Sequence, residues 1–396
     1  MNFSFAERVS TLKPSAIREL LKTPDHPDFV SFAIGNPSPE TFPVEDIQAL
    51  SADILKSRTL EALQYGISEG YAPLREATRR RMSEKHGVGR EFDECVIVSG
   101  GQQGIELSIK SLINENDVIL CEAPSFIGAL NAFHSFNARL IGVPMDGDGM
   151  DMEALERLLD VYPNTKMIYT IPTFQNPMGV TMSLARRKRL LELAEKYDVL
   201  ILEDSPYFEL RISGDYVPPI KSLDETGRVI FCGSFSKIVA PGIRVGYVIA
   251  HRDLAHKLLV GKQVSDVHTN MLWQMVVCDL MTKRDMDAHI EKCVSVYRRK
   301  RDLMVSALQQ HCAGKLTWNH PDGGLFLWAE LPDGVDSLPF CNRLKEEHVA
   351  AIPACHLYID PSVKQSGIRL NFSLPTDEQI ERGVAIMGRA LDEFVR

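Results

Sequence analysis

The chain has 396 residues, 44% of them hydrophobic and 24% charged, which is typical of a globular protein too long for one ordinary domain. Its formal net charge of −9 is spread along the sequence, which excludes a broad basic surface for nucleic acid or an anionic membrane. No apolar run approaches the roughly 20 residues that cross a bilayer, and the N-terminus does not resemble a secretion signal. We therefore expect a cytoplasmic protein that binds neither nucleic acid nor membrane.

Eight cysteines are scattered along the chain without a C-x-x-C pair. This spacing favours free, mostly buried thiols over a disulfide framework or a metal site. We expect no bound metal.

Short β-rich runs alternate with segments of helical periodicity between residues 94 and 250, a pattern typical of an α/β domain with a largely parallel sheet. Candidate helices cover residues 103–113 and 183–197, and Ser183 is a suitable cap for the second. In open α/β sheets ligands bind at the edge where the strands end, so residues just after each run are candidate site residues. The runs are residues 96–98, 118–120, 167–169, 199–202, 229–231 and 245–249.

The last hundred residues have a different character. A charged helical stretch at residues 285–310 precedes short strands near residues 325–331 and 368–372, which indicates a separate α+β domain. We predict a large domain at residues 46–284, a small domain at 285–396, and an N-terminal arm at 1–45 that joins the small domain.

The most informative segment is C-G-S-F-S-K-I-V-A-P-G-I-R-V-G at residues 232–246. The hydroxyls of Ser234 and Ser236 and the guanidinium of Arg244 can bind a phosphate dianion by charge-assisted hydrogen bonds. Lys237 lies between them in the sequence and can reach a group attached to that phosphate. On its own, S-x-S-K describes a solvated surface loop equally well.

Two further segments contain charged or polar groups that need a partner. Asp204 ends a predicted buried strand in I-L-E-D-S-P-Y, where an unpaired carboxylate would be costly to bury, although such an aspartate is as often a helix cap. Arg369 lies inside the apolar strand G-I-R-L-N-F-S, which calls for an anionic partner.

Glycines in V-S-G-G-Q-Q follow another strand and open a helix. The backbone N–H groups of Gly101 and Gln102 can therefore receive a phosphate at the positive end of that helix. Glycines at such a turn are weak evidence when taken alone.

Together these segments resemble the fold-type-I aminotransferases of class I/II, which use pyridoxal 5′-phosphate (PLP). The matching residues Asn176 (in N-P-M-G), Asp204, Lys237 and Arg369 occur in the family's order and at similar separations, over nearly the whole chain. The resemblance implies an α/β fold with an aspartate-aminotransferase-like large domain, a mostly parallel seven-stranded sheet and a smaller α+β domain. It also implies a homodimer with shared active sites.

The resemblance assigns roles to individual residues. Lys237 would hold PLP as a Schiff base, and Asp204 would pair with the pyridine nitrogen, which keeps the ring an electron sink. The phenolic oxygen would be bound by Tyr207 and Asn176, and Phe126 would stack on the ring. The phosphate would be bound by Gly101, Gln102, Ser234, Ser236 and Arg244, and by Tyr65 reaching from the neighbouring subunit.

Substrate recognition follows from the same resemblance. Arg369 would bind the substrate α-carboxylate, with Asn176 and Gly35 beside it, and Arg18 would contact the distal end of the substrate. The segments at residues 15–20, 31–37 and 63–70 look like the kynurenine/2-aminoadipate aminotransferase branch. That branch uses aromatic and dicarboxylic amino acids, usually with 2-oxoglutarate as acceptor.

The sequence departs from the family pattern at three places. Phe126 stands where many relatives have tyrosine, and Gly101 where several have serine or alanine. Residues 353–355, P-A-C, stand where relatives commonly have Pro-Gly, in a loop expected near Arg369. Substrate identity is therefore the least determined expectation.

The implied reaction is a transamination. The substrate amine displaces Lys237 from its aldimine, and the freed lysine moves a proton between the substrate α-carbon and the C4′ carbon of PLP, with ping-pong kinetics. A C–S lyase or a decarboxylase on the same fold is an alternative, because these residues do not choose the bond that breaks. A ligand-sensing regulatory domain is the alternative of another class, but the motifs begin by Gly35, which leaves no room for a DNA-binding module.

Overall fold

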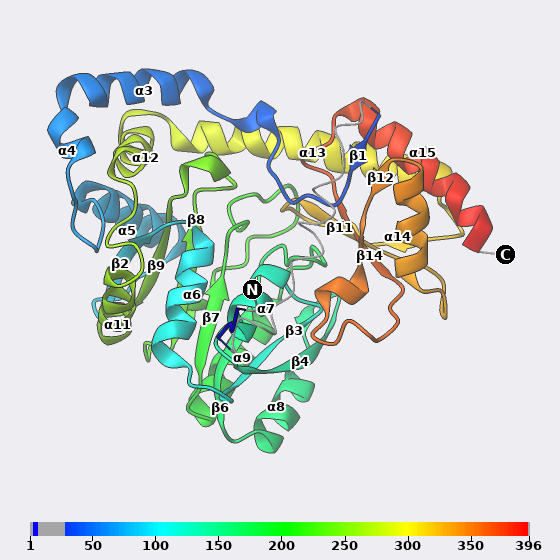
Figure 1. Ribbon diagram of the computed structural model, residues 1–396, viewed down its shortest axis with the longest axis horizontal. Helices are drawn as coiled ribbons and strands as arrows, with labels where there is room; N and C mark the ends of the chain where they lie inside the picture. The colour runs from blue at the N-terminus through cyan, green and yellow to red at the C-terminus, as the bar shows by residue number, and fades with distance from the viewer. Residues whose placement is uncertain (1–2, 7–27, 395–396) are drawn as a thin grey trace.

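A computed structural model describes residues 3–6 and 28–394, which form a large region around one sheet and a smaller C-terminal region (Figure 1). The large sheet has the strand order β2-β9-β8-β7-β6-β3-β4-β5. The strands from β8 to β4 run parallel, whereas β9 is antiparallel to β8 and β2, and β5 to β4. The strands are β2 (Asp93–Val98), β3 (Val118–Ala123), β4 (Arg139–Asp146), β5 (Gly149–Met150), β6 (Thr165–Thr170), β7 (Leu200–Asp204), β8 (Val229–Ser234) and β9 (Gly246–His251).

The predicted α/β class and largely parallel sheet are confirmed, but this sheet has eight strands instead of seven. The additional strand β5 has two residues and folds back onto β4. Two residues carry no periodicity that a sequence pattern could reveal. Strand β4 also lay outside the β-rich runs, because it contains Gly142 and Pro144, which are depleted in strands.

Both faces of the large sheet are buried. In β3, Val118 and Leu120 belong to the apolar cluster that includes residues of helices α8 (Met152–Val161) and α9 (Leu184–Lys196). Ile119 and Cys121 point to the other face and belong to the main core. This alternation buries successive side chains on opposite faces, which explains why the parallel strands are nearly continuous apolar runs.

Helices connect the strands of the large region. The predicted helix at residues 183–197 is α9, and Ser183 caps it, since its Oγ accepts a hydrogen bond from the backbone N of Arg186. The predicted helix at residues 103–113 is α6 (Gly101–Leu112), which begins two residues earlier than predicted. The remaining helices of this region are α3 (Val44–Ser57), α4 (Thr59–Leu63), α5 (Ala72–His86), α6 (Gly101–Leu112), α7 (Ile127–His134), α10 (Ile220–Leu223), α11 (Arg252–Gln263) and α12 (Met271–Lys283), with the 3-10 helices η1 (Pro39–Thr41) and η2 (Pro241–Ile243).

The C-terminal region has the predicted α+β character. Its antiparallel sheet has the order β10-β11-β14-β13, and the long helix α13 (Met286–His311) runs from the large region along this sheet (Figure 1). Its other elements are β10 (Thr317–Trp318), β11 (Phe326–Glu330), α14 (Ser337–Glu346), β12 (Val349–Ala350), β13 (Ile352–Pro353), η3 (Ala354–Leu357), β14 (Gly367–Asn371) and α15 (Asp377–Phe394).

The N-terminal strand β1 (Val30–Ser31) pairs in parallel with β12 of the C-terminal region. The backbone N of Phe32 extends this pairing with a 2.8 Å hydrogen bond to the carbonyl oxygen of Ala350. The chain then crosses to α3, which packs on α12. Within residues 3–6 and 28–394, no helix is both long and apolar enough to span a bilayer.

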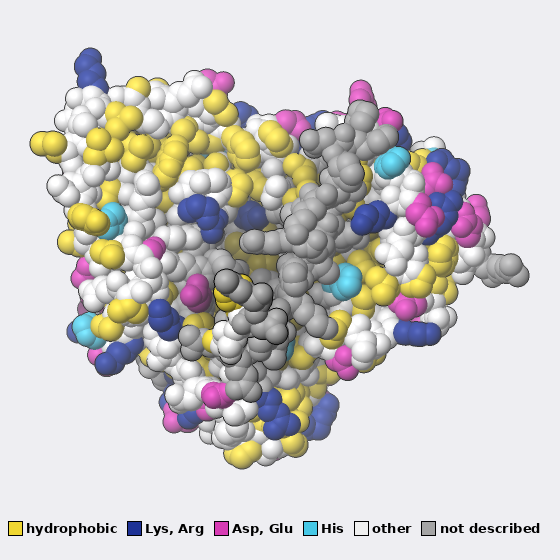
Figure 2. Space-filling view, in the orientation of Figure 1, with side chains coloured by type: hydrophobic (Ala, Val, Ile, Leu, Met, Phe, Trp, Pro, Cys, Tyr) yellow, Lys and Arg dark blue, Asp and Glu magenta, His cyan; other side chains and the backbone are white. Residues whose placement is uncertain are grey.

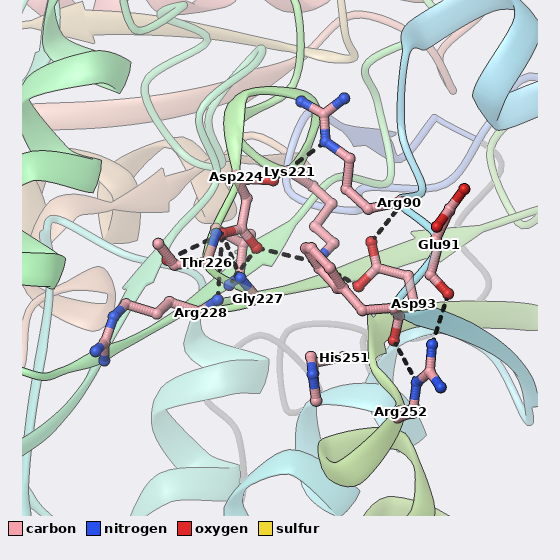
Figure 3. Close-up of polar contacts among 12 residues, drawn as sticks. Arg90, Glu91, Asp93, Lys221, Asp224, Thr226, Gly227, Arg228, His251 and Arg252 are labelled. Atoms are coloured by element: carbon pink, nitrogen blue, oxygen red, sulfur yellow. Dashed lines mark hydrogen bonds and ion pairs between the residues drawn. The ribbon is translucent and has the colours of Figure 1, made fainter.

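A buried cluster of charges closes the edge of the large sheet where its parallel strands begin (Figure 3). Lys221 has no exposed surface, and its Nζ lies 2.8 Å from Asp93 and 3.0 Å from Asp224, which are buried as well. Asp224 also accepts hydrogen bonds from the backbone N of Gly227 and Val229, at the start of β8. The cluster therefore fixes the loop before β8. It lies at the edge of the sheet where the parallel strands begin, opposite the edge where they end.

Candidate active site

A cavity of about 940 Å³ opens at the edge of the large sheet where the parallel strands end. Along this cavity the structure brings together every predicted site residue that it describes, except Tyr65. The predicted residues among those that line it are Gly35, Gly101, Gln102, Phe126, Asn176, Asp204, Tyr207, Ser234, Ser236, Lys237, Arg244 and Arg369. The expectation that the residues following the strands share one site is therefore supported by their position.

The secondary structure explains this convergence. Asp204 and Ser234 are the last residues of the neighbouring strands β7 and β8, and Asn176 follows β6. Phe126 follows β3 and is the N-cap residue of α7. Arg369 comes from the centre of β14 in the C-terminal region, so the cavity lies between the two sheets.

Lys237 lies on the turn after β8, and its Nζ donates a 2.7 Å hydrogen bond to the carbonyl oxygen of Gly35. Burial, and after it the positive charges of Arg369 and Arg244, lower the pKa of Lys237 to about 8. A lysine with this pKa has an appreciable neutral fraction near neutral pH, which suits both nucleophilic attack and proton transfer.

Asp204 is 4% exposed and forms no ion pair within the described part of the chain. Its Oδ2 accepts a 2.8 Å hydrogen bond from the hydroxyl of Tyr169. Burial raises the pKa of Asp204 to about 7, against the opposing effects of Tyr169 and Lys237. A protonated pyridine nitrogen would supply the cationic partner that this carboxylate lacks.

Arg369 is a buried cation that also lacks a carboxylate partner among the described residues. Its Nη1 donates to Oδ1 of Asn176 at 2.9 Å, its Nη2 donates to the carbonyl oxygen of Ala33 at 2.5 Å, and its Nε has no partner. The guanidinium lies 4.4 Å from the ring centroid of Phe326. Burial lowers the pKa of Arg369 to about 10. A substrate carboxylate would balance this charge.

Tyr207 lies between these charged groups. Its side chain is buried and hydrogen-bonded to Asn176, and Nζ of Lys237 is 5.8 Å from its ring centroid. Burial, followed by the charge of Asp204, raises the pKa of Tyr207 above its ordinary value, so its hydroxyl remains a hydrogen-bond donor.

The first turn of α6, Ser234, Ser236 and Arg244 together form one end of the cavity, which we call the polar cup. Gly100 has a φ of 82°, a backbone conformation that favours glycine, and a Cβ built there would contact the guanidinium of Arg244. Arg244 itself has a φ of 53°, and its Nη2 donates to the carbonyl oxygen of Ser99 at 3.2 Å. With Ser234 and Ser236 lining the same cavity, the cup fits a phosphate dianion.

Sequence reasoning did not assign a role to three residues of the site. Tyr169 donates to Asp204, Phe326 stacks on Arg369, and Glu122 accepts 3.0 Å and 3.2 Å hydrogen bonds from Gln175 and from the backbone of residue 171. A tyrosine or a glutamate inside an apolar strand is the signal that could have found two of them. Nothing in the sequence around Phe326 distinguishes it from a core residue.

Tyr65 is the predicted site residue that the structure describes away from the cavity. Tyr65 is 82% exposed, and its ring contacts the ring of His268 edge-on at a centroid separation of 5.8 Å. Its predicted role concerns a neighbouring subunit and stays a prediction. Arg18 lies outside the described residues.

Comparison with known proteins agrees with this geometry. The family model for aminotransferases of class I and II matches residues 27–386. The chain is 40% identical to an aromatic-amino-acid aminotransferase of Thermococcus litoralis, over 99% of this chain and 95% of the relative. It is 37% identical to a 2-aminoadipate transaminase of Thermus thermophilus, over 98% and 96% of the two chains.

A solved structure is equally similar. The kynurenine aminotransferase of Pyrococcus horikoshii, determined in complex with PMP, superposes with a TM-score of 0.94 at 37% identity, covering 98% of this chain and 97% of that one. The family match, the long alignments and the fold lead to one conclusion. The chain belongs to the class I and II aminotransferases and is a PLP-dependent transaminase.

Proposed function

We propose that the protein transfers the amino group of an aromatic or 2-aminoadipate-like L-amino acid to a 2-oxo acid such as 2-oxoglutarate. The observation that carries the proposal is the buried guanidinium of Arg369, which has no carboxylate partner in the described part of the chain and lines the same cavity as Lys237 and Asp204. The relatives that are named for aromatic, 2-aminoadipate and kynurenine substrates support this donor class.

The site residues fit PLP. When bound, PLP supplies an electron sink for the negative charge that develops at the substrate α-carbon. Asp204 would keep the proton on the ring nitrogen, and Tyr207 and Asn176 would donate hydrogen bonds to the phenolic oxygen. Phe126 would cover one face of the ring. The phosphate would be held by Gly101 and Gln102 at the start of α6 and by Ser234, Ser236 and Arg244.

Lys237 would carry out the proton transfer. With its pKa lowered to about 8, its free amine can accept the proton of the substrate α-carbon and return it at C4′. Arg369 would orient the substrate through its α-carboxylate, with Asn176 and Gly35 beside it. A second 2-oxo acid then uses the same residues in reverse, so the kinetics should be ping-pong.

A donor panel tests the substrate class. Initial rates with glutamate, 2-aminoadipate, aromatic and short aliphatic amino acids, each with 2-oxoglutarate, should show the highest kcat/KM for aromatic or 2-aminoadipate donors. A clear preference for short aliphatic donors would contradict the proposal. We further propose that Arg18 contacts the distal end of the substrate. Arg18→Ala should then reduce kcat/KM unequally across the panel, and an equal loss for all donors would count against that role.

We also propose a homodimer in which Tyr65 contacts the cofactor phosphate of the neighbouring subunit. Figure 2 shows hydrophobic side chains gathered near the upper edge of the molecule, over the region of α3 and α12. Leu60, Leu63 and Tyr65 are 86%, 70% and 82% exposed in the single chain. Large apolar side chains so exposed on adjacent turns favour a protein interface.

Two further expectations remain proposals. The eight cysteines are all unpaired and buried, which suits a reducing compartment, so we propose a cytoplasmic location. The pairing of β1 with β12 supports a division into an arm at residues 1–45, a large domain at 46–284 and a small domain at 285–396.

A further inference from the structure

A second fully buried lysine lies close to the polar cup. Lys262, in the last turn of α11, has no exposed surface. Its Nζ donates to Oε1 of Gln103 at 2.9 Å, to Oδ1 and Oδ2 of Asp266 at 2.8 and 3.0 Å, and to Oγ1 of Thr269 at 3.0 Å. Burying an ammonium group is costly, so these four contacts must offset its desolvation.

The same three acceptors also hold Ser99. The backbone N of Ser99 donates to Oε1 of Gln103 at 2.7 Å, and its Oγ donates to Oδ2 of Asp266 at 2.7 Å. The hydroxyls of Ser99 and Thr269 are 3.1 Å apart. Lys262 therefore orients each group that fixes Ser99, and it neutralises the carboxylate to which the Ser99 hydroxyl is bonded.

Ser99 in turn shapes the cup. It directly precedes Gly100 and the first turn of α6, where Gly101 lines the cavity. Its carbonyl oxygen accepts the 3.2 Å hydrogen bond from Nη2 of Arg244. Any shift of Ser99 would move both the N–H groups at the start of α6 and the guanidinium that the phosphate requires.

Ser99 follows strand β2, and a comparable buried lysine, Lys221, lies beside the other end of that strand. Lys221 is equally buried and pairs with Asp93, the first residue of β2 (Figure 3). Ser99 directly follows the last residue of β2. A six-residue strand places these two ends roughly 17 Å apart. Lys221, in α10, is thus a buried, ion-paired lysine that anchors the start of β2 and does not line the cavity.

We propose that Lys262 is a positioning residue for the cofactor phosphate, which holds Ser99 and, through it, the start of α6 and Arg244 in their binding geometry. The inference rests on the proposed assignment of the phosphate to this cup. Lys262 itself does not line the cavity.

The test compares how apo-protein variants bind PLP and pyridoxal, which lacks the phosphate. Lys262→Met should raise the Kd of PLP about tenfold, the effect of one lost charge-assisted hydrogen bond, and leave the Kd of pyridoxal within about twofold. Lys221→Met is the matched control, which should lower the unfolding midpoint but keep the wild-type ratio of the two Kd values. The inference would be overturned if Lys262→Met raised the Kd of PLP and the Kd of pyridoxal by the same factor, or changed neither Kd.

Ser99→Ala gives a second route that does not depend on a buried charge. Ser99→Ala should also raise the Kd of PLP more than the Kd of pyridoxal. The double variant Lys262→Met/Ser99→Ala should bind PLP little worse than Lys262→Met alone, because both changes break the same hydrogen-bond network. Fully additive losses would contradict the link through Ser99. If the wild-type protein itself shows no preference for PLP over pyridoxal, the assignment of the phosphate to this cup fails, whatever the variants do.

Discussion

The hydroxyl of Tyr169 donates a 2.8 Å hydrogen bond to Oδ2 of Asp204. The two residues lie on the neighbouring strands β6 and β7, and both are buried. Because the bond stabilises the charged form of the carboxylate, it opposes the effect of burial on the pKa of Asp204. Tyr169 thus helps to keep Asp204 ionised, which its proposed role at the ring nitrogen requires.

Tyr169→Phe should therefore raise the pKa of Asp204 further and lower kcat/KM about tenfold, the effect expected of one hydrogen bond to a charged group. The acidic limb of the kcat/KM profile should shift to higher pH. Tyr197→Phe, whose hydroxyl bonds Asp160 at the surface, is the control and should leave the profile unchanged. An unshifted acidic limb in Tyr169→Phe would argue against this role.

The pKa of Asp204 also predicts how stability depends on pH in the apo-protein. Its folded-state pKa of about 7 lies above the unfolded value near 4, so the folded state binds this proton more tightly. Stability from this group is present below the unfolded pKa and is lost as the pH rises through the folded pKa. Between pH 5 and 8 the loss should be about 3 kcal/mol.

Asp204→Asn lacks this titration. Urea unfolding of the apo-proteins should therefore show the stability of Asp204→Asn, relative to wild type, increasing between pH 5 and pH 8. Bound PLP would provide a cation beside Asp204 and reduce this dependence in the wild type. A constant difference between the two apo-proteins across this range would contradict the assigned pKa.

Lys221→Met should destabilise the fold by about 3–5 kcal/mol, because it leaves two buried aspartates, Asp93 and Asp224, without their cation. The free energy of unfolding in urea measures the loss. Lys196→Met removes an exposed lysine paired with Glu156 and should leave the unfolding midpoint nearly unchanged. Equal midpoints for both variants would show that the buried cluster contributes little.

The proposed role of Tyr65 predicts complementation between subunits. Mixed dimers of Lys237→Ala and Tyr65→Ala chains would contain one site with both residues intact. After verified subunit exchange, activity should rise toward about a quarter of wild type by statistical pairing. Activity equal to the average of the two parent dimers would place Tyr65 outside the neighbouring site.

The positions of the site residues along the chain could be predicted from the sequence, but their contacts could not. Asp204, Ser234 and Asn176 follow β-rich runs, and parallel strands bring their ends to one edge of the sheet. The hydrogen bond between Arg369 and Asn176 joins residues 193 positions apart, one in β14 of the C-terminal region and the other in the loop after β6. No local pattern encodes such a contact, because it depends on how the two regions pack.

The same limit applies to Lys262. In the sequence it is one of two lysines on an amphipathic helix, and only the packing of α11 against α6 shows that it is buried. The short strand β5 was missed for a different reason, since two residues give no periodicity. The residue types at the ends of the strands could therefore be identified from the sequence, whereas side-chain contacts between different elements could be identified only from the folded structure.

The central claim is that Lys237 binds the cofactor in this cavity. Borohydride reduction of the PLP-loaded protein, followed by peptide mapping, tests it directly, because reduction makes the bond between the lysine and the cofactor permanent. We predict a single phosphopyridoxyl label on the peptide that contains Lys237, and none in Lys237→Ala. Stoichiometric label on another lysine, with Lys237 unmodified, would contradict the account.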